Sequence, residues 1–127
     1  MTRSIAVVGA SADRRKFGNK CVRAYAEAGW TVYPVHPTES AVEGLTAYTS
    51  VAAIPAERLD RVSVYLAPPR LLAALADIAT KPVGELWLNP GTESPEVLAE
   101  AVRLGLHAVE ACSIVDIGVS PSRYPDA

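Results

Sequence analysis

Hydrophobic residues along this chain form short runs that alternate with segments of helical spacing. Ser4–Val8 is an apolar run that predicts a buried strand. The next segment, Asn19–Ala28, predicts a helix, because its apolar residues recur three or four positions apart while Lys20 faces away. Further strands are predicted over Trp30–Val35, Val62–Leu66, Glu85–Leu88 and His107–Val109, a short strand or turn over Gly44–Tyr48, and further helices over Pro69–Ala79 and 95–104.

Strands and helices therefore alternate, and no linker divides the pattern. This order predicts an α/β fold with a doubly wound, mostly parallel five-stranded sheet and helices on both faces, in a single domain. The expected strand order is 3-2-1-4-5, which opens a ligand-binding crevice between the carboxyl ends of the first and fourth strands. Residues 1–117 are assigned to this domain, and the polar, proline-bearing residues 118–127 are predicted to be a loose tail.

The turn after the first strand has the composition of a phosphate-binding turn. Gly9-Ala10-Ser11 leads toward the helix, and backbone N–H groups at a helix start bind anions together with the helix dipole. Gly9 would let the backbone approach a ligand closely, because it carries no Cβ. The dinucleotide fingerprint G-x-G-x-x-G is incomplete, since Ser11 and Arg14 stand where its second and third glycines would be. An ordinary strand-to-helix turn is the alternative.

Three more loops should meet this turn at the crevice: His36-Pro37, Ala67-Pro68 and the loop that begins at Asn89. An NAD-binding fold carries Asp or Glu at the end of the second strand, where it binds a ribose hydroxyl. Here Val35-His36-Pro37 occupies that place, which weighs against NAD.

Composition and charge narrow the function further. The 127-residue chain has a net charge of −2, which argues against nucleic-acid binding, although Arg14, Arg15 and Lys16 form a basic cluster where a phosphate would lie. The two cysteines and two histidines lack metal-ligand spacing, and no local context suggests a catalytic set. No secretion signal and no membrane-spanning stretch is recognised, so we expect a cytoplasmic protein with free thiols.

The crevice loops and their neighbours form a series of short motifs over about residues 3–115. They are Val8-Gly9-Ala10-Ser11, Lys16-Phe17-Gly18-Asn19-Lys20, Tyr33-Pro34-Val35-His36-Pro37, Val42-Glu43-Gly44-Leu45, Leu86-Trp87-Leu88-Asn89-Pro90-Gly91 and Cys112-Ser113-Ile114-Val115. In this order and spacing they resemble the small stand-alone CoA-binding domain proteins, a family related to the N-terminal domain of the succinyl-CoA synthetase α subunit. The resemblance implies a Rossmann-like fold that binds CoA, with no established reaction for most members. The sequence departs from the family at His36, where asparagine is usual, at Asn89, where glutamine is common, and around Cys112.

If the site binds CoA, its predicted residues correspond to three parts of the ligand. The phosphate turn, Arg15 and Lys16 would hold the pyrophosphate, because it needs N–H donors and positive charge. Flat apolar side chains would line the adenine, and the pantetheine arm would pass Asn89. The predicted site is Gly9, Ala10, Ser11, Arg15, Lys16, Val35, His36, Pro37, Ala67, Pro68 and Asn89, with no catalytic residue and no metal ligand.

Three functions stay open at this point. The favoured one is a CoA or acyl-CoA binding protein, a binding or regulatory module without catalysis of its own. The second is an NAD(P)-binding redox enzyme or sensor, and the third is an interaction subunit with a vestigial nucleotide site. A homodimer or a partner enzyme is compatible with the favoured function, whereas nucleic acid and membrane are not expected as partners.

Overall fold

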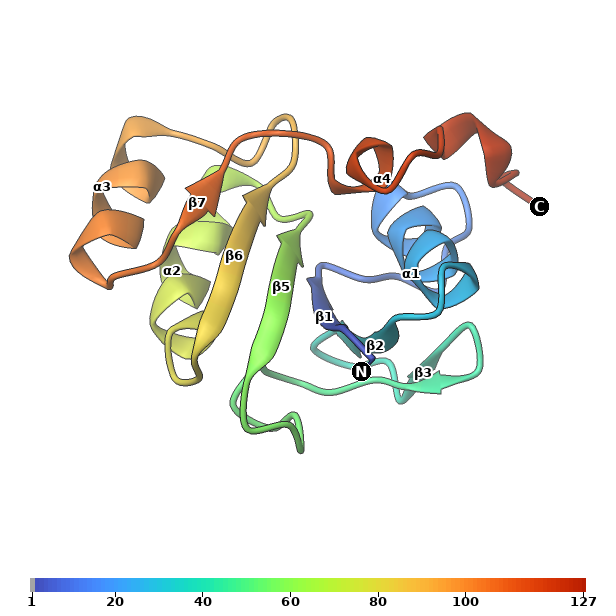
Figure 1. The fold of residues 1–127 in the computed structure, drawn as a ribbon, viewed down its shortest axis with the longest axis horizontal. Coiled ribbons are helices and arrows are strands. Elements are labelled where there is room, and N and C mark those ends of the chain that lie inside the picture. Colours follow the sequence, from blue (N-terminus) through green and yellow to red (C-terminus); the bar gives the residue numbers. More distant parts are fainter. Residues whose placement is uncertain (1) are drawn as a thin grey trace.

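A five-stranded parallel sheet forms the centre of the computed structural model, which describes residues 2–127. The strand order is β2-β1-β5-β6-β7, and every neighbouring pair runs parallel (Figure 1). The strands are β1 (Ser4–Val8), β2 (Thr31–Val35), β5 (Leu59–Val64), β6 (Val83–Leu88) and β7 (Ala108–Val109). The predicted α/β class and the neighbouring position of β1 and β5 are therefore confirmed.

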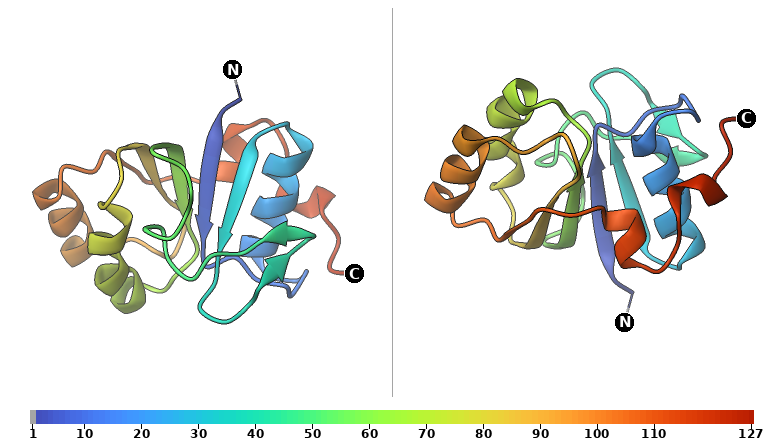
Figure 2. Two further views of the ribbon diagram at one scale, coloured as in Figure 1. Left: turned by 90° about the horizontal axis from the view of Figure 1, so that it is seen from below. Right: turned by 90° about the horizontal axis from the view of Figure 1, so that it is seen from above.

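Helices cover both faces of this sheet, as the prediction requires. On one side α1 (Phe17–Glu27) packs beside β1 and β2, and the short helix α4 (Ser113–Asp116) lies against α1. On the other side α2 (Pro68–Ile78) and α3 (Pro95–Arg103) pack against each other (Figures 1 and 2). The connections from β1 through α1 and from β5 through α2 place the start of both helices at the carboxyl edge of the sheet.

The two faces of β1 show how one strand serves two cores. Ala6 and Val8 pack into the core shared with α2 and α3, whereas Ile5 and Val7 pack into the core under α1. Because side chains alternate across a strand, a run without polar residues is expected when both faces are covered. The continuous apolar run that predicted this strand is thus explained by its central position in a parallel sheet.

The predicted third strand is mostly a separate hairpin. β3 (Ala41–Val42) and β4 (Leu45–Thr46) pair antiparallel outside the main sheet. Their two-residue turn has positive φ at both Glu43 (49°) and Gly44 (76°), as a tight hairpin turn demands. Only Tyr48 reaches the predicted place beside β2, through one parallel bridge to Val35. The fifth strand of the sheet is instead β7, at the opposite edge.

Residues 118–127 differ from the expected loose tail. They contain a 3₁₀ helix, η1 (Pro121–Arg123), and Tyr124 is only 5% exposed, buried against α1. Lys20 pairs with Asp126 at 2.7 Å, and Arg23 donates to the Pro125 carbonyl at 2.9 Å. The buried Tyr124 ring and these polar contacts together hold the segment against α1, which its polar composition did not indicate.

Candidate functional site

Two adjoining hollows form one groove above the carboxyl ends of β1 and β5. Both are lined by Gly9, Lys16, Tyr65 and Leu66, so they are continuous. The β2-side hollow, of about 400 Å³, extends over the loop after β2 and the first turns of α2. The β6-side hollow, of about 330 Å³, extends over the start of α1 and the loop after β6, Pro90–Thr92. The groove lies where a doubly wound fold is expected to bind its ligand.

Most of the predicted site residues line this groove. The β2-side hollow is lined by seven of them: Gly9, Ala10, Ser11, Lys16, Val35, His36 and Pro37. Ala67 lines the β6-side hollow. Arg15, Pro68 and Asn89 line neither hollow. Pro68 is the first residue of α2, where a missing N–H costs no helical hydrogen bond.

Glycine at positions 9 and 18 brings the turn, the helix and the neighbouring strand into close contact. Gly9 has φ of +90°, and a Cβ there would lie 2.7 Å from the Tyr65 carbonyl oxygen. A Cβ on Gly18 would overlap the Gly9 carbonyl oxygen. The first reason for glycine at position 9 is therefore packing of the fold, rather than the ligand approach that the sequence suggested. The same pair of glycines keeps the floor of the groove free of side chains.

Several backbone donors on the groove wall have no protein acceptor. Within residues 2–127, the N–H groups of Ala10, Ser11 and Gly18 donate to no backbone or side-chain oxygen. Helix α1 also has no side-chain cap at Lys16 and no acidic residue in its first turn. Its positive end is thus left for an anion from outside the protein.

The phosphate turn is held from behind by Asn19. This buried side chain donates to the Ser11 carbonyl at 2.8 Å and to Glu43 at 3.0 Å, and accepts from Arg23 at 2.7 Å. Ser11 in turn accepts from the Asp13 N–H at 3.0 Å through its hydroxyl. These bonds fix the shape of the turn before any ligand binds, which lowers the entropic cost of binding.

The basic cluster predicted at this turn separates into different environments. Arg15 is bound to Asp13 through two side-chain contacts, of 3.0 and 2.9 Å, and these lie outside the groove. The hydrogen bonds from Arg15 lower the pKa of Asp13 to about 2, so this carboxylate stays charged beside the guanidinium. Lys16 has no ion pair within the described chain and lines both hollows. Lys16, and not Arg15, is the residue of the pair that supplies charge to the groove.

His36 organises the loop after β2. Its Nδ1 accepts from the N–H of Thr38 at 3.0 Å and of Glu39 at 2.9 Å, so the ring proton is on Nε2. In an Asx turn, an asparagine side chain accepts hydrogen bonds in the same way from backbone N–H groups that follow it in the chain. The imidazole thus takes over the turn-forming role of the asparagine that the family resemblance leads one to expect here.

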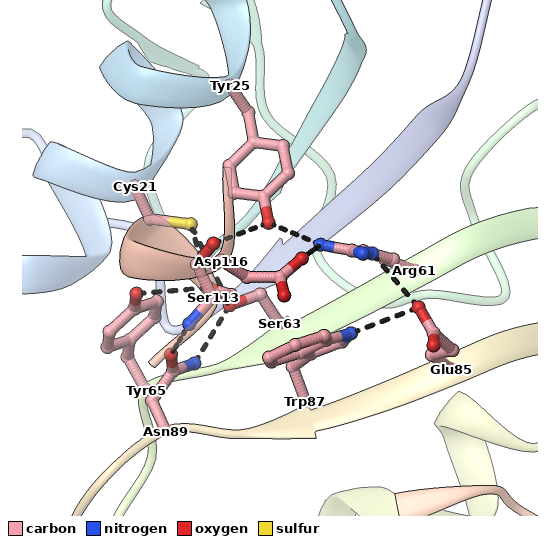
Figure 3. A network of polar contacts seen from close by, with 10 residues as sticks. All are labelled: Cys21, Tyr25, Arg61, Ser63, Tyr65, Glu85, Trp87, Asn89, Ser113 and Asp116. Carbon is pink, nitrogen blue, oxygen red and sulfur yellow. Dashed lines mark hydrogen bonds and ion pairs between the residues drawn. The ribbon is translucent and has the colours of Figure 1, made fainter. Parts of the chain in front are cut away.

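Asn89 points into a buried polar network and away from the groove. Its amide nitrogen donates to Ser63 Oγ at 2.8 Å and to the Val64 carbonyl at 2.9 Å. Its amide oxygen accepts from the Ser113 N–H at 2.9 Å (Figure 3). Asn89 therefore joins β5, β6 and α4, and it is a positioning residue rather than part of the groove wall.

The rest of this network joins the sheet to α1 and α4. The hydroxyl oxygens of Ser63 and Ser113 are 2.7 Å apart, and Cys21 Sγ lies 3.7 Å from each (Figure 3). Burial raises the pKa of the Cys21 thiol, which keeps it protonated and chemically inert. Tyr65, which lines both hollows, contacts Ser113 Oγ at 3.5 Å and so connects the groove to the network.

Arg61 forms the charged part of the same network. Its guanidinium pairs with Glu85 at 3.0 Å and Asp116 at 2.7 Å and lies over the ring of Trp87 (Figure 3). It also lies over the ring of Trp30, 5.2 Å from the ring centroid. Burial lowers the pKa of Arg61, but the hydrogen bonds with Asp116 and Tyr25 raise it more, so the net shift is upward. The arginine stays charged and clamps α4 to the sheet.

Some groove residues were not predicted from the sequence. These are Tyr65, Leu66, Phe17, Arg70 and Thr92. Arg70 carries the clearest available signal, because a cation in the first turn of a helix opposes the helix dipole and so suggests a purpose other than helix stability. Phe17, at the start of α1, is 57% exposed and lines the β6-side hollow.

Two other kinds of site find no support in residues 2–127. Among the residues that the structure describes, no three histidine, cysteine or acidic side chains gather in a way that could hold a metal ion. None of the helices in this part of the chain has the length and apolar content needed to cross a membrane.

Comparison with known proteins identifies a family for this chain. A family model described as CoA binding domain matches residues 3–118. Over 56 residues the chain is 46% identical to the α subunit of the ADP-forming acetate–CoA ligase II of Pyrococcus furiosus; the match covers 43% of this chain but only 12% of that subunit.

Solved structures share the fold over most of the chain. A conserved hypothetical protein from Pyrococcus furiosus superposes with a TM-score of 0.81 and 30% identity, over 90% of this chain and 98% of the other. The dinucleotide-forming acetyl-coenzyme A synthetase 1 of Candidatus Korarchaeum cryptofilum, in complex with phosphate and ADP, superposes with a TM-score of 0.75 and 25% identity. That match covers 85% of this chain and 25% of the synthetase, so the chain is similar to one part of a larger enzyme.

Proposed function

This chain belongs to the CoA binding domain family, and we propose that it binds coenzyme A or a coenzyme A thioester in the groove above β1 and β5. The observation that carries the proposal is the set of unpaired donors at one place. Ala10, Ser11 and Gly18 line the groove and have backbone N–H groups without an acceptor in residues 2–127, and the Lys16 side chain, which lines both hollows, has no partner in the same residues. A pyrophosphate requires this combination of backbone donors and positive charge.

The two hollows differ in a way that suits the two ends of CoA. The β2-side hollow holds a second cation, Arg70, and the flat apolar residues Val35 and Pro37, which suit a charged adenosine end. Apart from Lys16, the β6-side hollow is lined by uncharged residues, including Phe17 and Pro90, which suit the neutral pantetheine arm. Bound CoA would supply a thiol that carries acyl groups as thioesters.

We further propose that the protein is a binding module without catalysis of its own. The titratable side chains of the groove already have structural partners or lack a second reactive group. His36 uses Nδ1 to hold its loop, and Asp77 accepts from the N–H groups of Val51 and Ala52 at 2.8 and 3.0 Å. These contacts leave neither residue paired with a nucleophile. An interaction subunit with a vestigial site stays an alternative.

Thermal unfolding with added ligand tests the proposal. Protein free of carried-over nucleotide is melted with millimolar CoA, acetyl-CoA or NAD. A ligand at about one hundred times its dissociation constant stabilises the native state by roughly 2.7 kcal/mol, which raises Tm by several degrees in a domain of this size. We expect this shift with CoA and acetyl-CoA and not with NAD, because the end of β2 carries no acidic residue to bind the ribose.

Two other outcomes would overturn the proposal. A larger shift with NAD than with CoA would favour the redox enzyme or sensor. No shift with any of the three ligands would favour the interaction subunit with a vestigial site.

A further inference from the structure

The β2-side hollow has an uneven distribution of charge. Its charged side chains are Lys16, Arg70 and Asp77. Asp77 lies two turns further along α2 than Arg70, and its carboxylate already accepts from the N–H groups of Val51 and Ala52. Two cations and one anion give the hollow a net positive charge, and the positive charges come from two places, the phosphate turn and the first turn of α2.

Arg70 has no structural role that would account for its position. Among residues 2–127 it forms no ion pair, no hydrogen bond through its side chain and no stacking contact with an aromatic ring. A cation at this end of a helix is opposed by the helix dipole, and α2 has no acidic residue in its first turn to compensate. The exposed guanidinium is thus held at the rim of the hollow without a protein anion beside it.

The rest of the hollow offers no other cation for an anionic group at this end. Residues 36–40, the loop after β2, contain no lysine or arginine, and Glu39 adds a negative charge there. Lys16 lies at the junction of the two hollows, beside the phosphate turn. A ligand with a second phosphate on the β2 side would meet Arg70, whose planar guanidinium binds phosphate through two parallel N–H bonds.

We infer that Arg70 binds the 3′-phosphate of coenzyme A and makes the site selective for CoA over ligands without this group. The inference rests on the proposed function, because it assigns a part of the same ligand. Dephospho-CoA, which differs from CoA only by loss of the 3′-phosphate, is the ligand that isolates the contact. In this site Lys16 serves the pyrophosphate that both ligands share, and Arg70 serves the phosphate that only CoA carries.

Calorimetric titration of the full chain with CoA and with dephospho-CoA tests the assignment. The variants are Arg70→Gln, which removes the charge, and Arg70→Lys, which keeps it. We expect wild-type protein to prefer CoA by about tenfold or more, the size of a charge-assisted contact. Arg70→Gln should bind CoA about as weakly as dephospho-CoA while its affinity for dephospho-CoA stays unchanged. Arg70→Lys should retain part of the preference.

Lys81→Gln is the matched control. It removes one positive charge at the opposite end of the molecule, in a hollow at the amino ends of the strands. It should leave both affinities unchanged, and circular dichroism of all variants checks that they fold. Equal affinity of the wild-type protein for both ligands, or an equal loss for both in Arg70→Gln, would overturn the role of Arg70 and leave CoA binding intact. Absence of binding by either ligand would overturn the proposed function itself.

Discussion

The groove and the buried network lie at the same carboxyl edge of the sheet, but they differ in whether their polar groups have partners within the protein. In the network, every side-chain polar group of Asn89 and Ser63 has a partner within the protein. Among the groove residues, the N–H groups of Ala10 and Ser11 and the charges of Lys16 and Arg70 have no partner in residues 2–127. Polar residues are thus a poor guide to the site unless their partners are known.

The difference follows from access to water. Ser63 and Ser113 are fully buried, and a buried polar group without a partner costs about 1–3 kcal/mol, so the network must be internally satisfied. The groove is open, and water can satisfy its donors at little cost until a ligand replaces it. Unpaired donors on an open, rigid surface are therefore the feature that separates a binding site from a structural network.

Substitution at Gly9 should have the largest effect, because the groove floor is also a packing contact of the fold. Gly9→Ala would place a Cβ 2.7 Å from the Tyr65 carbonyl oxygen at a φ of +90°. We expect loss of about 3 kcal/mol or more in the free energy of unfolding, from strain and overpacking together. Urea unfolding followed by circular dichroism measures it.

Gly105→Ala is the matched control for this change. Gly105 also has positive φ, at 72°, but its Cβ would meet no atom within 4 Å. It should cost only about 1 kcal/mol, the conformational part alone. Equal costs at the two positions would show that the close approach to Tyr65 contributes nothing.

Arg61→Met should be the next largest change, since it breaks the network at its charged end. The substitution keeps the apolar packing against Trp30 and Trp87 but leaves Glu85 and Asp116 without their cation. Both carboxylates are partly exposed, at 33% and 39%, so we expect destabilisation by about 2–3 kcal/mol rather than the full cost of a buried charge. Ligand binding should be retained once the temperature is low enough for the variant to fold.

Arg58→Met provides the comparison for Arg61. Arg58 pairs with Asp60 at 3.0 Å, but its side chain is 62% exposed, and exposed pairs contribute little. Chemical unfolding of both variants should separate them clearly. A cost for Arg61→Met no greater than that for Arg58→Met would mean that the network does not clamp α4 to the sheet.

Lys16→Ala should have the smallest effect on stability and a clear effect on binding. We expect CoA affinity to fall by roughly tenfold, because a charge-assisted contact is lost from the groove. Arg15→Ala removes the same charge one residue away, where the side chain is bound to Asp13, and should leave the affinity nearly unchanged. Titration with CoA at low and high salt measures the affinity of both variants. Similar losses of affinity in the two would mean that the basic cluster acts only through its overall charge.

Short-range patterns in the sequence were enough for most of the fold and for the phosphate turn. The strand Ser4–Val8 was predicted with the bounds that the structure has, because a central strand of a parallel sheet is apolar on both faces. The turn at Gly9-Ala10-Ser11 was found because the change from strand to helix and the small residues are adjacent in sequence. His36 and Pro37 followed from the position of the loop alone, as the carboxyl ends of neighbouring strands share one edge.

Other residues could be assigned only when the packing was known. Asn89 was predicted at the crevice, but the direction of its side chain depends on Ser63 and Ser113, which are 26 and 24 residues away in sequence. Tyr124 anchors a segment whose composition reads as loose, because its partner surface on α1 is distant in sequence.

Local sequence patterns were enough to establish the alternation of strands and helices, the family resemblance and the loops that meet at the carboxyl edge. These depend on periodicity and on residues next to one another, and hydrophobic burial imposes that periodicity locally. The packing of distant segments determines which polar residues have partners within the protein and which line the groove. That choice depends on hydrogen bonds and ion pairs between segments far apart in the chain, as at Arg61 and Asp116, and on the absence of such partners at Lys16 and Arg70 within residues 2–127.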